Sequence, residues 1–180
     1  MFEPRSVAPG IDLRILRPED ASMLAAAYER NRAHLTPWEP VRPEEFFTEQ
    51  FQREDIEHRL VATQSAESYP LALVRNNEIL GRFNLAGITR GPFQSAGLGY
   101  WVDRNHLGRG LASATVRAIV EEAGEQLGLH RIEESTLVHN IASQKVLLKS
   151  GFQQIGMAPQ YLKIAGHWQD HNLYQIILHE

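Results

Sequence analysis

The feature that most constrains this chain is a strand, a glycine-bearing loop and an amphipathic helix that follow one another without a break. Residues 98–102 read as a strand, and the loop 103–110 contains two glycines. After the loop, apolar residues recur at the spacing of one helix face before Gly128 ends the pattern, at Ala112, Val116, Ile119, Val120, Ala123 and Leu127. Because residues 132–138 read as another strand, this segment predicts a strand–helix–strand unit.

The rest of the chain predicts more strands than helices around that unit. Strands are expected at residues 12–17, 71–75, 79–88, 152–163 and 168–178, and helices from Asp20, over 44–64 and over 142–149. One such unit in a mostly antiparallel chain predicts a mixed, twisted sheet of about six to seven strands, flanked by about four helices, in an α/β or α+β fold. No linker or repeat divides the sequence, so we expect a single domain over residues 1–180.

The composition excludes several classes of protein and of site. The 180 residues include no cysteine, so disulfides, thiolate nucleophiles, iron–sulfur clusters and thiolate zinc sites are excluded. We find no apolar run near ~18 residues and no basic-then-apolar signal at the N-terminus. The formal charge of −4 argues against a nucleic-acid-binding module. We therefore expect a soluble cytoplasmic protein without a membrane or nucleic-acid partner.

The glycine loop has the features of a phosphate site. Glycine lets the main chain approach a ligand closely, and the first amides of the following helix favour a phosphate or pyrophosphate. Arg104 and Arg109 flank the loop and would add charge-assisted contacts. A plain strand-to-helix turn needs the same glycines, and that interpretation stays open. A P-loop is excluded because Gly110-Leu111-Ala112 lacks the Lys-Ser/Thr ending, and Ser113 in place of a third glycine disfavours a dinucleotide site.

Four segments, in chain order, resemble one family. Residues 105–110 (Asn-His-Leu-Gly-Arg-Gly) resemble the pyrophosphate loop Gln/Arg-x-x-Gly-x-Gly/Ala of the GNAT acetyltransferase superfamily, and residues 140–152 resemble its Asn-x-x-Ser/Ala…Gly-Phe segment. Residues 31–38 (Asn-Arg-Ala-His-Leu-Thr-Pro-Trp) are similar to the Asn-Arg-x-x-Leu-x-x-Trp segment of the RimJ/RimL branch. Residues 166–174 are similar to that branch's Gly-x-x-x-Asp-x-x-x-Tyr ending. The resemblance covers nearly the whole chain.

The resemblance implies a GNAT fold and an N-acetyltransferase that uses acetyl-CoA as cosubstrate and no metal ion. The first loop position, Gln or Arg in the superfamily, is Asn105 here, so Arg104 or Arg109 would have to supply that contact. The residues that the resemblance assigns to acetyl-CoA are Trp101, Val102, Arg104, Asn105, Leu107, Gly108, Arg109, Gly110, Leu111, Ala112, Asn140, Ser143 and Lys145.

A catalytic acid is also implied by the resemblance. Ser143 occupies the position of the Ser that protonates the CoA thiolate in the RimL-like branch. Many superfamily members use a tyrosine as the general acid at a later position of the same helix. Leu147 stands at that position here, so a tyrosine acid is excluded there. Asn140 and Ser143 are also good capping residues for the following helix, and this structural role is the alternative.

The catalytic base is harder to assign. Gln160 stands where the branch has a candidate Glu, and an amide cannot accept the proton. Glu133 and Glu134 are neighbours on a predicted strand, so alternation turns one of them toward the cleft and the other away. His139, at the end of the same strand, is a further candidate. A surface position is the alternative for each.

The acceptor side carries the weakest signal. Leu35, Trp38 and Tyr161 are expected to line the acceptor pocket, although Leu35 and Trp38 equally suit core positions. Residues 39–57 include seven acidic side chains and two basic ones, which fits either attraction of a cationic acceptor or a solvated helix face. For Lys145 and Lys149, contact with CoA phosphates and a solvated face are likewise both open.

We interpret the chain as an N-acetyltransferase that moves an acetyl group directly to a primary amine, with a protein N-terminal α-amine, such as that of a ribosomal protein, as the expected acceptor. A small amine, polyamine or antibiotic is the alternative acceptor. A non-catalytic acyl-CoA-binding module is the alternative function, favoured by Gln160 and Leu147. Both a monomer and a homodimer remain open.

Overall fold

Strands β5 (Ser95–Val102) and β6 (Arg131–Leu137), joined through helix α3 (Leu111–Glu125), form the predicted strand–helix–strand unit. The computed structural model, which describes residues 2–179, places these strands side by side and parallel. The apolar face of α3 follows the helical period of its sequence, and Val116 and Ile119 on that face are fully buried against the sheet.

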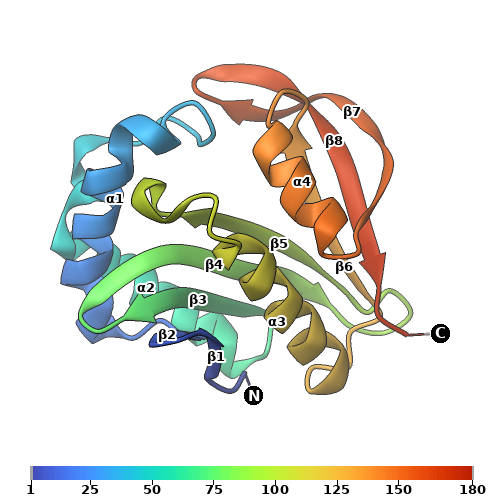
Figure 1. The fold of residues 1–180 in the computed structure, drawn as a ribbon, viewed down its shortest axis with the longest axis horizontal. Coiled ribbons are helices and arrows are strands. Elements are labelled where there is room, and N and C mark those ends of the chain that lie inside the picture. Colours follow the sequence, from blue (N-terminus) through green and yellow to red (C-terminus); the bar gives the residue numbers. More distant parts are fainter. Residues whose placement is uncertain (1, 180) are drawn as a thin grey trace.

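The unit lies in the middle of one sheet (Figure 1). Within the described residues the sheet has eight strands in the order β1-β2-β3-β4-β5-β6-β8-β7, and every neighbouring pair except β5–β6 is antiparallel. The remaining strands are β1 (Arg5–Ala8), β2 (Ile11–Ile15), β3 (Ser68–Arg75), β4 (Glu78–Thr89), β7 (Gln153–Ile164) and β8 (His167–Ile177). The prediction of a mixed, mostly antiparallel sheet in an α/β fold is confirmed.

Helices cover both faces of the sheet (Figure 1). They are α1 (Ala21–Leu35), α2 (Glu49–Gln64), α3, α4 (Ile141–Lys149) and the short 3₁₀ helices η1 (Pro18–Asp20), η2 (Glu44–Phe47) and η3 (Arg104–His106). Helices α1 and α2 bury one face in a cluster that includes Ile79 and Trp101, and α3 and α4 bury the other with Phe83 and Leu147. No helix in residues 2–179 combines the length and apolar character that crossing a membrane requires.

Three differences from the predicted elements have local causes. The additional strand β1 has only four residues, too few to show alternation in the sequence. Residues 44–47 form η2 apart from α2, because Thr48 has an extended backbone and caps α2, accepting a hydrogen bond from the Phe51 N–H at 3.2 Å. Strand β5 begins at Ser95 rather than at residue 98, and its first three residues carry the pairing with β6.

Candidate active site

The sheet is split between β5 and β6. Their parallel pairing covers Ser95 with Arg131, Ala96 with Ile132, and Gly97 with Glu133, and the register ends there. Strand β5 continues to residue 102 and β6 to residue 137, so in the described structure the second half of each strand faces the other without pairing to it. Such a split leaves main-chain donors and acceptors available to a ligand.

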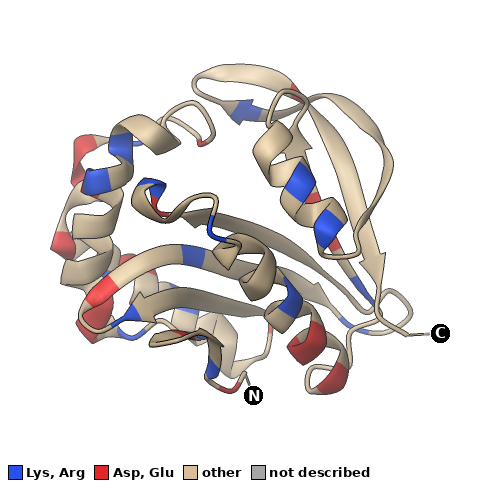
Figure 2. Cartoon of the chain, viewed as in Figure 1, with Lys and Arg blue, Asp and Glu red and all other residues tan. Residues whose placement is uncertain are grey.

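The loop after β5 opens toward α4. Gly108 and Gly110 have φ angles of 72° and 76°, which glycine adopts without steric strain. Gly110 precedes α3, and no side chain caps that helix end, so its first amides stay available to an anion. Between this loop and α4 lies a cavity of about 300 Å³, here called the loop cavity, which Lys145 and Lys149 line from α4. Figure 2 shows these basic positions of α4 across from the start of α3.

Apart from Asn140 and Ser143, the residues that the sequence assigns to acetyl-CoA fall into three groups. Those that line the loop cavity are Val102, Leu107, Gly108, Gly110, Leu111, Ala112 and Lys145. Arg104, Asn105 and Arg109 are exposed on the loop beside it. Trp101 lies elsewhere, because strand alternation turns it to the α1 side of the sheet, where its ring is 5.1 Å from the ring of Tyr28. The Trp101 side chain therefore does not line the loop cavity, and the assignment of this residue to the cofactor stays a prediction.

The side chain of Asp103 connects the loop to α1 through hydrogen bonds. Its buried carboxylate accepts hydrogen bonds from Arg30 Nε at 2.7 Å, Asn31 Nδ2 at 2.8 Å and the Asn105 N–H at 2.8 Å. The Asn31 Oδ1 in turn accepts a hydrogen bond from the Arg104 N–H at 2.9 Å. Burial opposes ionisation of Asp103, but the hydrogen bonds outweigh it and lower its pKa to about 2. This positioning role of Arg30 and Asn31 was not predicted from the sequence.

Ser143 lines a second cavity, of about 330 Å³, that adjoins the loop cavity across the first turn of α4; we call it the central cavity. The Ser143 N–H donates to the side chain of Asn140 at 3.2 Å, which caps α4. The Ser143 hydroxyl lies 2.9 Å from the hydroxyl of Tyr100. Tyr100 stacks on Phe83 with 5.4 Å between ring centroids, so two hydroxyls are held together at the split. Burial, with the negative charge of Glu134, raises the pKa of Tyr100.

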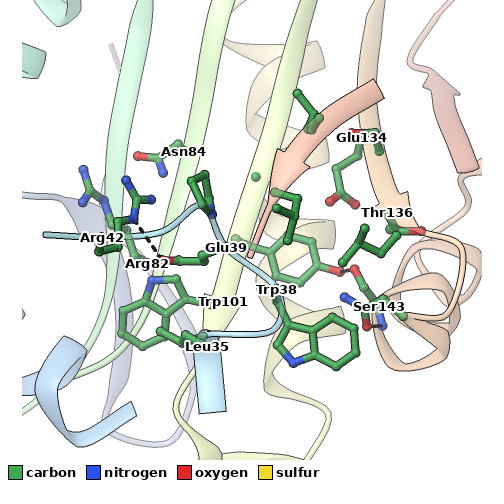
Figure 3. A pocket seen from close by; sticks show the side chains of 18 of the residues that line it. Leu35, Trp38, Glu39, Arg42, Arg82, Asn84, Trp101, Glu134, Thr136 and Ser143 are labelled. Atoms are coloured by element: carbon green, nitrogen blue, oxygen red, sulfur yellow. Dashed lines mark hydrogen bonds and ion pairs between the residues drawn. The ribbon is translucent and has the colours of Figure 1, made fainter. Parts of the chain in front are cut away.

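Alternation along β6 separates two neighbouring carboxylates. Glu134 lines the central cavity, and its Oε2 is buried without a hydrogen-bond partner in the described part of the chain. Burial raises the pKa of Glu134 well above its usual value. Glu133 does not line this cavity; its Oε2 lies 3.4 Å from Ser95 Oγ and its Oε1 lies 3.8 Å from Arg131 Nη1. Figure 3 shows Glu134 on the same side of the cavity as Ser143.

Residues 36–43 roof the central cavity. Leu35 and Trp38, which the sequence predicts for an acceptor pocket, both line it, and their acceptor role stays a prediction. The Trp38 ring lies 5.5 Å from the ring of His139, which follows β6, and the Glu39 carbonyl accepts a hydrogen bond from the Ala165 N–H at 2.9 Å. The roof therefore spans the split from α1 to the β6–β7 side, and His139 contacts the roof rather than lining the cavity.

Tyr161 and Gln160 lie on β7 outside the central cavity. The register of β7 with β8 shifts between Ala158 and Leu162, and Gln160 has a φ of 47°. This irregularity turns Leu162 into the cavity in place of Tyr161, whose ring packs 5.7 Å from that of His171. Tyr161 instead lines a separate cavity of about 260 Å³ together with Glu133 and Glu134, and its acceptor role stays a prediction. Gln160 lines neither of these two cavities.

Charged and polar side chains deep in the central cavity were missed by the sequence analysis. Arg82 and Asn84 of β4 and Asp55 of α2 line it together with Glu39 and Arg59. Alternation places Arg82 and Asn84 on the opposite face from Phe83, but nothing in the sequence indicates that a cavity lies there.

A split sheet, an uncapped helix end behind a glycine loop and a serine between two cavities together form the candidate site. The model of the acetyltransferase (GNAT) domain family matches residues 11–153. The chain belongs to the GNAT family. The predicted GNAT fold and the enzyme class, an N-acetyltransferase, are thereby confirmed.

Relatives of this GNAT chain come from the predicted branch. The [ribosomal protein uS5]-alanine N-acetyltransferase of Escherichia coli K12 is 33% identical over 182 residues, covering 96% of this chain and 94% of its own. The crystal structure of the ribosomal-protein-S5-alanine acetyltransferase of Vibrio fischeri has a TM-score of 0.95 at 30% identity, covering 99% and 98% of the two chains. RimJ of Mycobacterium smegmatis, solved in complex with CoA-disulfide, has a TM-score of 0.89 at 27% identity, covering 93% and 81%. The resemblance to the RimJ/RimL branch is confirmed.

Proposed function

We propose that this enzyme transfers the acetyl group of acetyl-CoA to the α-amine of a protein N-terminus. The observation that carries the proposal is the pair of hydroxyls on Ser143 and Tyr100, which lies at the split between the loop cavity and the central cavity. Phosphates of the cosubstrate would bind the first amides of α3, with Lys145 and Lys149 opposite them. The acceptor would occupy the central cavity beneath residues 36–43.

In this proposal Ser143 is the general acid. The amine forms a C–N bond to the acetyl carbon, the C–S bond breaks, and the Ser143 hydroxyl donates a proton to the leaving thiolate. The hydrogen bond between the two hydroxyls positions Ser143, and when Tyr100 donates it stabilises the charge that Ser143 gains. The main chain of β5 beyond Gly97, which has no pairing to β6 in the described structure, would donate to the developing oxyanion.

Glu134 is the proposed base. It lines the central cavity beside Ser143, whereas Glu133 and Gln160 do not. A base works best when its pKa lies near the operating pH, and burial moves the pKa of Glu134 in that direction. The proton that the amine loses passes to this carboxylate.

An α-amine suits this site better than a lysine side chain. The pKa of an α-amine is about 7.7–8.0 and that of a lysine about 10.4, a gap of about 2.5 units, or roughly 3.5 kcal/mol in deprotonation cost. A single buried carboxyl is a modest base, so an acceptor that is already partly neutral is favoured. The names of the relatives agree, since two of them are acetyltransferases for the alanine of a ribosomal protein.

An acetyl-transfer screen tests the proposal. The purified enzyme, acetyl-CoA and a peptide with a free α-amine and no lysine should release thiol and yield a peptide acetylated at its N-terminus, read by mass spectrometry. A matched peptide with a blocked N-terminus and one lysine, and the polyamine spermidine, should react at least tenfold more slowly. Preference for lysine or spermidine would overturn the acceptor assignment. If acetyl-CoA binds but no amine is acetylated, the chain is a binding module.

A further inference from the structure

One end of the central cavity has no part in the transfer chemistry proposed above. Ser143 and Glu134 lie at one end, whereas Arg42 and Arg82 lie at the other, with Glu39 beside them toward the middle of the cavity (Figure 3). Arg59 of α2 lines the same cavity. The transfer requires an amine, a thioester, an acid and a base, so three guanidinium groups need a separate explanation.

Asp55 forms ion pairs with two of these arginines, Arg59 and Arg82. Arg82 is only 3% exposed; its Nη2 lies 2.8 Å from Asp55 Oδ2, and its Nη1 donates to the Tyr28 hydroxyl at 3.2 Å. Arg59 donates through Nε to both oxygens of the same Asp55 carboxylate, at 3.0 and 2.9 Å. The group of Arg59, Asp55 and Arg82 therefore carries a net positive charge on the wall of the cavity.

Glu39 balances the third arginine only in part. The Arg42 Nε lies 3.3 Å from Glu39 Oε2, and the guanidinium lies over the ring of Phe46 at 4.4 Å. Burial raises the pKa of Glu39, so its carboxyl resists ionisation. Within residues 2–179, neither Arg42 nor Arg59 has a hydrogen-bond partner at its Nη groups.

The wall of the cavity also holds buried polar atoms without partners. Arg82 Nε, Trp101 Nε1 and Asn84 Oδ1 are buried and make no hydrogen bond within residues 2–179. Two of these three atoms carry an N–H donor, and all three residues line the central cavity. Buried donors without acceptors are costly, and ligand oxygen atoms would satisfy them.

We propose that this end of the central cavity is an anion subsite that selects acceptors with a carboxylate close to the reacting amine. Guanidinium groups bind carboxylates in a bidentate manner, and an excess of them beside the amine site fits a molecule with both groups. The carboxylate has two sources, namely an acidic side chain in the first two residues of a protein N-terminus or the α-carboxylate of a free amino acid. The inference rests on the proposed function, because it takes the central cavity as the acceptor site.

Matched acceptors separate the two sources. Three pairs of acceptors are compared. The peptides that begin Glu-Ala and Gln-Ala differ by one charge, as do those that begin Ala-Glu and Ala-Gln. Free alanine differs from alanine amide only in its α-carboxylate. In at least one pair, we expect the acidic member to have a kcat/KM at least tenfold higher than that of its neutral partner. Most of this difference should come from a lower KM. Preference within a peptide pair identifies a protein N-terminus, and preference only for free alanine identifies an amino acid. Equal kcat/KM values in all three pairs overturn the subsite.

A variant and a binding measurement complete the test. Arg59→Gln should reduce the preference for the acidic acceptor to less than threefold, whereas Arg53→Gln, on the same helix and paired with Glu49 at the surface, should preserve it. Calorimetry with the N-acetylated products of all three pairs reports on the subsite even without turnover. Equal affinity within every pair overturns the subsite, while tighter binding of an acidic product without transfer to any amine supports the subsite and overturns the proposed function.

Discussion

The lining of the loop cavity comes from two short segments, residues 102–113 and 142–149. The central cavity instead draws residues from α1, η2, α2, β4, β5, β6, α4, β7 and β8 and from residues 38–42. The loop cavity is a local structure, because its lining comes from the glycine loop, the start of α3 and α4. The second exists only after the whole sheet has assembled and residues 36–43 have crossed the split. Substitutions in the first region should therefore change affinity for acetyl-CoA, and substitutions in the second should change acceptor use and catalysis.

The largest expected effect belongs to the central cavity. Glu134→Gln should lower kcat/KM by roughly 100-fold or more, because a positioned base contributes about 10²–10⁴. The effect depends on pH, since burial raises the pKa of Glu134 and its carboxyl must ionise to act. The ratio of wild-type to variant kcat/KM on one acceptor should therefore rise as the pH rises through that pKa. Glu133→Gln, the matched control, should stay within twofold; a larger loss at Glu133 would reverse the assignment.

Loss of the Ser143 hydroxyl should have the next largest effect. Ser143→Ala should lower kcat by roughly 10- to 100-fold, with KM for acetyl-CoA little changed. The helix should remain capped, because Asn140 accepts its hydrogen bond from the main-chain N–H of Ser143. Steady-state kinetics and circular dichroism check both statements. Unchanged kcat would remove Ser143 as the acid.

Tyr100→Phe should have a smaller effect on kcat than Ser143→Ala, and this effect should depend on Ser143. Removing its hydroxyl should reduce kcat by roughly two- to tenfold, the range expected for one hydrogen bond. If Tyr100 acts through Ser143, the double variant should be no slower than Ser143→Ala alone. Additive losses in that cycle would show that the two hydroxyls work independently.

A stability experiment tests the anchor between the two regions. Asp103→Asn should lower the free energy of unfolding at neutral pH by about 1.5–3 kcal/mol, the value of hydrogen bonds to a charged group. Since the folded-state pKa of Asp103 is lowered to about 2, its contribution is present above its unfolded value of about 3.9 and is lost as the pH falls toward 2. Urea unfolding at pH 7 and pH 3 should show the difference shrinking, with exposed Asp12→Asn unaffected at either pH.

The smallest expected effect is on the loop cavity. Replacing Lys145 and Lys149 together by Gln should raise the KM for acetyl-CoA by roughly two- to tenfold without changing kcat, and added salt should reduce the difference. Lys163→Gln, on β7 away from this cavity, is the control. A change in kcat rather than KM would contradict the division between the two regions.

The sequence predicts the first region better than the second for a physical reason. Glycines at positive φ, an uncapped helix start and the Asn140 cap are features of consecutive residues, so periodicity and motif spacing indicate them directly. The central cavity depends on register and on which elements cross. The shift in β7 that replaces Tyr161 by Leu162, and the placement of Arg82 on a cavity rather than a packed face, have no local signal. Glu133 and Glu134 were predicted in part. Alternation along the strand predicts that their side chains diverge, but it does not predict which of them faces the central cavity.

The short pairing of β5 and β6 gives the sheet two rims in its interior. Proteins normally shield an unpaired rim from other chains with charge, proline or an added segment. Here the hydrogen bond between Ser143 of α4 and Tyr100 of β5 and the ring contact between Trp38 and His139 span the seam. Those amides of β5 that face the seam should therefore exchange with deuterated solvent faster than the amides paired to β4, and acetyl-CoA should slow them.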